Sequence, residues 1–137
     1  MTPIAPVKHP LVKSLMIFVG VSGCFSVLFG AWLAHAGQTL ATEVLATLET
    51  ALQYQLFHTL ALMATLVWAI ASFATGSPSR ILLAAGIAFM VGIVCFSGSI
   101  YIKIFYGVAL IGKLTPFGGI SLAVAWLLLS IEGKNNL

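Results

Sequence analysis

The strongest constraint in this sequence is an uninterrupted apolar run. From Ser14 to Ala36 the chain passes through 23 residues without an aspartate, glutamate, lysine or arginine. An α-helix rises about 1.5 Å per residue, so this run is long enough to cross a bilayer core about 30 Å thick. The run therefore predicts a membrane-spanning helix.

Three further apolar runs follow, separated by polar or turn-forming segments. Charged residues make up only 7% of the chain, whereas a soluble domain carries about 25%. The sequence therefore predicts an all-α membrane protein with a single four-helix bundle at residues 14–131. The predicted helices cover about residues 14–36, 52–74, 81–102 and 116–131, between a basic N-terminal tail at 1–13 and a polar C-terminal tail at 132–137.

The first run has one alternative interpretation. Lys8 and Lys13, followed by an apolar run and by Ala34-His35-Ala36, have the form of a secretory signal with an A-x-A cleavage site. The run is longer than the about 7–15 apolar residues of a typical signal. We therefore expect it to be the first membrane helix.

The segment from Gly37 to Leu52 is more polar than the runs on either side. It contains Glu43, Glu49 and four threonines, while its apolar residues recur at helical spacing. This pattern predicts a short amphipathic segment at the membrane interface after the first helix.

The distribution of positive charge predicts an orientation. Four crossings place both termini on one side of the membrane, and lysine and arginine are enriched in cytoplasmic segments. Cytoplasmic termini would put four of the six basic residues inside and two outside: Lys8, Lys13, Arg80 and Lys134 against Lys103 and Lys113. A net charge of +3, scattered in this way, does not indicate a nucleic-acid partner.

Small residues form two stripes at a spacing of four, which places each stripe on one face of a helix. Such stripes let helix backbones approach closely in lipid. We expect both to be helix contacts, within one chain or between copies. The stripes are Ser22, Ser26, Gly30 and Ala34 in the first helix, and Ala84, Ala88 and Gly92 in the third.

Polar side chains gather at the end of the predicted bundle that lies away from the termini. On the second helix, Tyr54, Gln55 and His58 are spaced to share a face. A histidine inside the membrane is costly unless it finds a partner, and Ser97 and Ser99 are at a similar depth. The sequence predicts one polar pocket or latch formed by His35, Tyr54, Gln55, His58, Ser97, Ser99, Tyr101 and Thr115.

Three interpretations of this cluster are open at this point: a hydrogen-bonded latch, a ligand site, and a metal or haem site. His35 and His58 could bracket an iron or copper ion, but the chain has no close-spaced histidine pair and no CxxCH. Cys24 and Cys95 lack metal-site spacing and are expected to be packing residues. We therefore predict neither a metal nor a cofactor.

Four sequence blocks carry a resemblance to a known family. They occur in the right order, with similar spacing, in a match from about Leu15 to Ile131. They resemble the signature blocks of domain-of-unknown-function family 423, the transmembrane protein 256-like family, although that family usually has Phe-Gly at Trp32-Leu33. The resemblance implies a multi-pass protein of the bacterial cytoplasmic membrane, and no activity. The blocks are GAWLAHAG (30–37), QYQLFHTLAL (53–62), FSGSIY (96–101) and LTPFGGISL (114–122).

The residues favour a non-enzymatic function. No carboxylate pair is readable across a helix, and no nucleophile has a base at a recognisable spacing, so no catalytic residue is predicted. We expect a structural or accessory protein that packs with itself or within a larger membrane complex. The alternative is a binder or carrier of a small amphiphile, such as a lipid or quinone. A channel or transporter is disfavoured because ionisable groups do not continue through the membrane depth.

Overall fold

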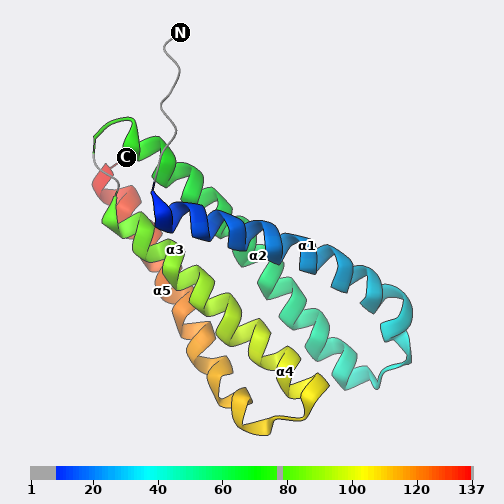
Figure 1. Cartoon of the computed structure of the whole chain (residues 1–137). Helices are drawn as coiled ribbons and strands as arrows, with labels where there is room; N and C mark the ends of the chain where they lie inside the picture. The colour runs from blue at the N-terminus through cyan, green and yellow to red at the C-terminus, as the bar shows by residue number, and fades with distance from the viewer. Residues whose placement is uncertain (1–8, 77–78, 137) are drawn as a thin grey trace.

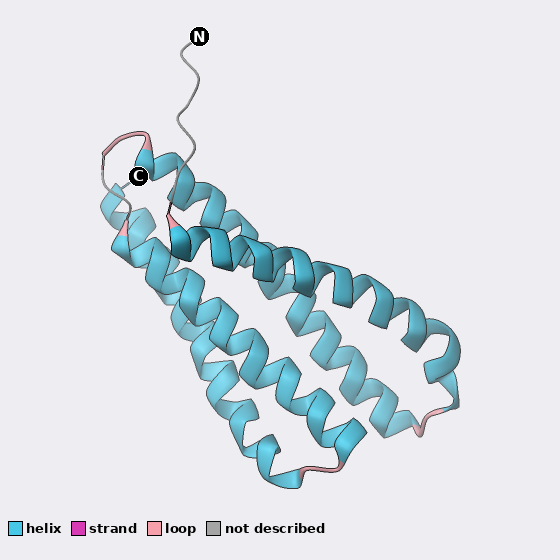
Figure 2. Ribbon diagram, viewed as in Figure 1, coloured by secondary structure: helices cyan, strands magenta, loops and turns pink. Residues whose placement is uncertain are grey.

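The computed structural model describes residues 9–76 and 79–136, and these residues form a helical bundle without strands (Figures 1 and 2). Four stretches are long and apolar enough to span a membrane, which confirms the predicted all-α membrane fold. The helices are α1 (Pro10–His35), α2 (Thr42–Phe73), α3 (Arg80–Ile93), α4 (Ser99–Tyr106) and α5 (Leu114–Asn136), joined in part by η1 (Ala36–Thr39), η2 (Val94–Gly98) and η3 (Ala109–Lys113).

The helix bounds differ from prediction in several places. Helix α1 begins at Pro10, inside the predicted N-terminal tail, and residues 1–8 of that tail lie outside the described residues. The largest differences are in α2 and α5. Helix α2 begins at Thr42, so the predicted amphipathic segment supplies the first turns of this helix and is not a separate element. Its pattern is that of a helix packed on one side, because Leu48 is fully buried while Glu43 and Glu49 are exposed. Helix α5 continues to Asn136 and includes most of the predicted tail.

The third membrane span is continuous from Arg80 to Tyr106 but contains a π-helical turn, η2, between α3 and α4. Ser79 caps its first turn by accepting a hydrogen bond from the Leu82 amide at 3.3 Å. Gly107 ends the span with φ +68°, a left-handed conformation that glycine adopts without steric cost.

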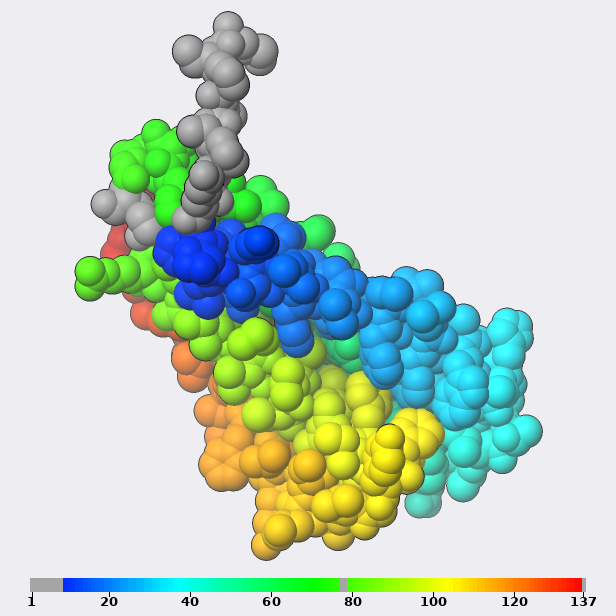
Figure 3. Space-filling view, in the orientation of Figure 1, coloured from blue at the N-terminus to red at the C-terminus, as the bar shows by residue number. Residues whose placement is uncertain are grey.

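The chain runs up and down through two long hairpins that converge at one end (Figure 1). The first turns of α1 and α3 and the last turns of α2 and α5 meet there, and we call this the termini end. The main core includes Leu15, Leu62, Leu66 and Phe89, all fully buried. At the far end α1 and α2 spread away from α4 and α5, and the space-filling view shows two lobes there (Figure 3).

Helix α5 packs closely against the span formed by α3 and η2. A methyl group placed on Gly118 would lie 2.7 Å from the carbonyl carbon of Cys95 and 2.8 Å from the Phe96 Cα atom. A methyl group on Gly92 would overlap the side chain of Leu122. Helix α5 therefore packs directly on backbone at the π-helical turn.

Most of the small-residue stripe positions are contacts within the chain. Ser22, Ser26 and Gly92 are buried, and a methyl group on Gly30 would lie 3.3 Å from Leu52 Cδ2. Ala88 is half-buried and its carbonyl accepts a hydrogen bond from Ser121 Oγ at 2.8 Å. One end residue of each stripe lies outside these contacts: Ala34 in the first stripe and Ala84 in the second are exposed.

Candidate functional site

A chain of hydrogen bonds joins α1, α2 and α4. The Tyr101 hydroxyl donates to Gln55 Oε1 at 2.9 Å, and Gln55 Nε2 donates to Ser22 Oγ at 3.0 Å. Ser22 Oγ also lies 2.7 Å from Thr59 Oγ1. Ser22, Gln55 and Thr59 are buried and Tyr101 is half-buried, and a small open pocket of about 270 Å³ borders Ser22, Gln55 and Tyr101. We call these four residues the Gln55 network.

Local helix geometry explains this arrangement. Gln55 and Thr59 are four residues apart and lie on the face of α2 that packs against α1. Ser22 is small enough to let the two backbones approach, and its carbonyl accepts the hydroxyl of Ser26 at 2.8 Å. Ser22 was predicted only as a packing residue and Thr59 was not predicted, although its i,i+4 spacing from Gln55 can be read in the sequence.

Two further polar bridges fix η2 and α4 to their neighbours. Ser97 Oγ donates to the Ala51 carbonyl of α2 at 2.7 Å. Ser99 Oγ donates to the Phe96 carbonyl at 3.0 Å and lies 2.7 Å from Thr115 Oγ1 of α5. Both serines are buried. These predicted site residues therefore act as helix-to-helix connections.

His58 and Tyr54 lie on another face of α2. His58 Nδ1 is 2.6 Å from the Tyr54 carbonyl oxygen, and the His58 ring centroid is 6.3 Å from that of Trp126 on α5. The Tyr54 ring stacks on Phe96 at 4.5 Å. A helix turns about 100° per residue, so Tyr54 and Gln55 point to different neighbours.

The single predicted pocket is therefore divided. Among the described residues, His58 makes no direct hydrogen bond with Ser97 or Ser99, and its Nδ1 atom lies against the Tyr54 carbonyl oxygen. His35 is exposed at the end of α1, away from the Gln55 network. The part of the chain that the structure describes holds no group of three or more His, Cys, Asp or Glu side chains suited to a metal. The lack of a metal or cofactor stays a prediction.

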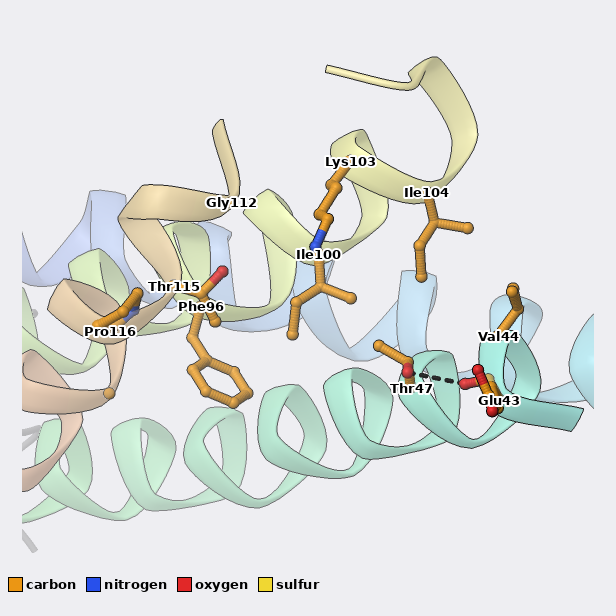
Figure 4. A pocket seen from close by; sticks show the side chains of 11 residues that line it. Glu43, Val44, Thr47, Phe96, Ile100, Lys103, Ile104, Gly112, Thr115 and Pro116 are labelled. Atoms are coloured by element: carbon orange, nitrogen blue, oxygen red, sulfur yellow. Dashed lines mark hydrogen bonds between the residues drawn. The ribbon is translucent and has the colours of Figure 1, made fainter. Parts of the chain in front are cut away.

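Two grooves open at the far end. One, of about 570 Å³, lies between α2, α4 and α5 (Figure 4). Its walls carry Glu43 and Thr47 on α2, Lys103 on α4 and Thr115 on α5, around apolar side chains that include Phe96. We call it the charged groove.

The other groove lies between α1 and α4, has about 640 Å³ and is lined mainly by aromatic rings. The Phe29 ring lies 5.1 Å from Tyr101, and the Trp32 ring 5.9 Å from Phe105. Tyr106 at its edge is 80% exposed. The aromatic side chains thus add ring contacts between α1 and α4 to the hydrogen bonds of the Gln55 network, and Tyr101 takes part in both.

These features define a multi-pass membrane protein of four spans, held together by buried hydrogen bonds between helices. The chain belongs to the family described as "Protein of unknown function (DUF423)", whose sequence model matches residues 29–119. The resemblance seen in the four sequence blocks is confirmed.

Relatives of this chain carry membrane-protein names. It is 32% identical over 116 residues to a UPF0382 membrane protein of Haemophilus influenzae, covering 84% of this chain and 89% of the relative. It is 31% identical over 123 residues to the UPF0382 inner membrane protein YgdD of Escherichia coli K12, covering 87% and 88%. The UPF0382 membrane protein YwdK of Bacillus subtilis is 28% identical, with 91% and 99% covered. No solved structure matches the chain significantly.

Proposed function

We propose that this protein is a non-enzymatic structural or accessory protein of the bacterial cytoplasmic membrane that packs with itself or within a larger membrane complex. The observation that carries the proposal is that the polar side chains within the bundle are used to join helices. Tyr101 donates a hydrogen bond to Gln55, and Gln55 donates one to Ser22. Groups engaged in this way stabilise a bundle.

Native mass spectrometry of the detergent-extracted protein tests this proposal. We expect a defined oligomer or a stoichiometric companion subunit. A monomer without a companion would contradict an assembly role, and a monomer carrying a stoichiometric small molecule would favour amphiphile binding.

Binding or carriage of a small amphiphile is the second candidate function, and the charged groove favours it. Glu43 and Lys103 provide opposite charges on facing elements, and Thr115 adds a hydroxyl beside an apolar wall (Figure 4). An amphiphile with a polar head suits such a lining. Lys103→Ala should then reduce the retained ligand mass, whereas Lys113→Ala, an exposed residue outside the lining, should not.

The substitution His58→Ala is predicted to lower the free energy of unfolding by about 1 kcal/mol, because the ring contacts to Phe89 and Trp126 are lost. Copy number and bound mass should not change. Unfolding in mixed detergent micelles, together with native mass spectrometry, measures both. Loss of a companion or ligand at unchanged stability would show that His58 belongs to a binding site.

We also propose that both termini face the cytoplasm, on the basis of the asymmetry in basic residues. In a variant without Cys24 and Cys95, Gln38→Cys is expected to react with a membrane-impermeant maleimide in intact cells. Asn135→Cys should react only after the membrane is permeabilised. The reverse pattern would invert the orientation.

A further inference from the structure

A carboxylate lies buried at the termini end of the bundle. Glu132 of α5 is only 3% exposed, and its Oε2 atom is buried without a hydrogen-bond partner among the described residues. An ionised carboxylate in this position is costly unless a cation or a hydrogen-bond donor reaches it. The burial of Glu132 was not predicted, because this residue was assigned to the polar C-terminal tail.

A cavity of about 610 Å³ adjoins this carboxylate, between the end of α2, the start of α3 and the end of α5. Arg80, the first residue of α3, lines the same cavity together with hydroxyl groups, Trp68 and Ile81. The N-terminus of a helix attracts phosphate because its dipole and its first amide groups favour an anion, although in α3 the Leu82 amide is already bound by Ser79. We call this cavity the headgroup pocket, and its hydroxyl residues are Ser72, Thr75 and Ser79.

The two charged residues of the headgroup pocket suit a ligand that carries both signs. Glu132 requires a cation that can donate hydrogen bonds, while Arg80 and the start of α3 suit a phosphate. The pocket is formed where membrane spans end, so it lies near the depth of lipid headgroups. Trp68 and Ile81 supply an apolar wall for the glycerol and the upper acyl chains.

We propose that the headgroup pocket binds a lipid with a primary ammonium and a phosphodiester, the chemistry of phosphatidylethanolamine. Glu132 accepts hydrogen bonds from the ammonium group, and Arg80 binds the phosphate. This site lies at the opposite end of the bundle from the charged groove. It holds a bilayer lipid as a bound component and does not depend on the proposed assembly role.

Native mass spectrometry with defined lipids tests the assignment. The full-length protein is delipidated in detergent and mixed with equal amounts of phosphatidylethanolamine, phosphatidylcholine and phosphatidylglycerol. We expect phosphatidylethanolamine to be retained preferentially, because the quaternary ammonium of phosphatidylcholine has no N–H donor and phosphatidylglycerol has no cation. Glu132→Gln should reduce phosphatidylethanolamine retention about tenfold, as expected for loss of one charge-assisted hydrogen bond. Arg80→Gln should reduce retention of all three lipids, because each carries a phosphodiester.

Matched control variants and a soluble competitor test whether Glu132 selects the ligand and whether that ligand is a lipid. Lys134→Gln in the same helix and Glu49→Gln at the far end are exposed and should leave retention unchanged. Equal retention of the three lipids, or an unchanged preference in Glu132→Gln, would overturn the proposal. If free phosphoethanolamine binds as tightly as the lipid, the site belongs to a soluble ligand and the lipid assignment is wrong.

A stability measurement distinguishes lipid binding from a purely structural role of Glu132. Without lipid, Glu132→Gln is expected to unfold at the same or a higher detergent concentration than the original chain, since a buried unpaired charge is removed. A clear loss of lipid-free stability would mean that Glu132 pairs inside the protein, with Arg80 for example, and would refute the pocket. The copy number of the detergent-extracted protein is independent of this outcome, so the lipid site and the assembly role can fail separately.

Discussion

Gly118→Ala is expected to destabilise the bundle strongly, because the added methyl group has no room. The added carbon would lie 2.7 Å from the Cys95 carbonyl carbon and 2.8 Å from the Phe96 Cα atom, and both belong to the backbone. Backbone at a π-helical turn cannot move aside as a flexible side chain can. Overpacking of this kind costs about 3 kcal/mol, which exceeds the gain of about 1 kcal/mol in helix propensity.

The next residue in α5 provides the control. A methyl group on Gly119 would lie 3.8 Å from Phe96 Cδ2, an ordinary contact distance. Gly119→Ala should therefore keep or slightly raise the free energy of unfolding, while Gly118→Ala should lower it by about 2 kcal/mol. The two variants are compared by reversible unfolding in mixed micelles, with the helical signal in circular dichroism as the measure of folded protein. Equal stability of the two variants would show that Gly118 of α5 does not pack against the backbone of η2.

Gln55→Leu is expected to have an effect of similar size. Leucine fills a similar volume but removes the acceptor of the Tyr101 hydroxyl and one donor to Ser22. A fully buried hydroxyl left without a partner costs about 1–3 kcal/mol, and the Tyr101 hydroxyl is half-buried. We predict a loss of about 2 kcal/mol in the free energy of unfolding, with greater mobility between α1 and α4.

A double-mutant cycle isolates the bond itself. Tyr101→Phe removes the donor of this hydrogen bond. The double variant with Gln55→Leu should lose less free energy of unfolding than the sum of the two single variants, by a coupling energy of about 1 kcal/mol. Tyr54→Phe is the matched control, because the described residues include no hydrogen-bond partner of that hydroxyl, and its effect should stay within about 0.5 kcal/mol. Additive effects of Gln55→Leu and Tyr101→Phe would exclude the Gln55 network as a stabilising unit.

Much of the fold could be predicted from the sequence because the bilayer imposes a simple rule. A segment such as Ser14 to Ala36 must satisfy its own backbone hydrogen bonds in lipid, and a helix does so within the segment. Length and apolar character therefore predicted the number and approximate place of the spans. Helix bounds were less accurate, since helix Thr42–Phe73 continues through a polar segment that carries no breaker.

The candidate site was predicted only in part. The pattern identified Gln55, Ser97, Ser99 and Tyr101 as inward polar residues, and each forms a hydrogen bond in the bundle. The pattern could not predict which neighbour each of these residues bonds to, because the rotation of each helix and the choice of partner depend on packing between distant segments. The burial of Glu132 could not be predicted for the same reason. It depends on how the end of α2, the start of α3 and the end of α5 lie relative to one another.

The sequence by itself determined that this chain is a multi-pass helical membrane protein, because twenty or so apolar residues in a row have one stable state in lipid. Only the tertiary structure decided that His58 faces Trp126 while Gln55 faces Ser22 and Tyr101. The physical reason is that helix formation is local, whereas the choice of which polar groups meet is made by close contacts, such as that of Gly118 on the Phe96 backbone, between residues far apart in the chain.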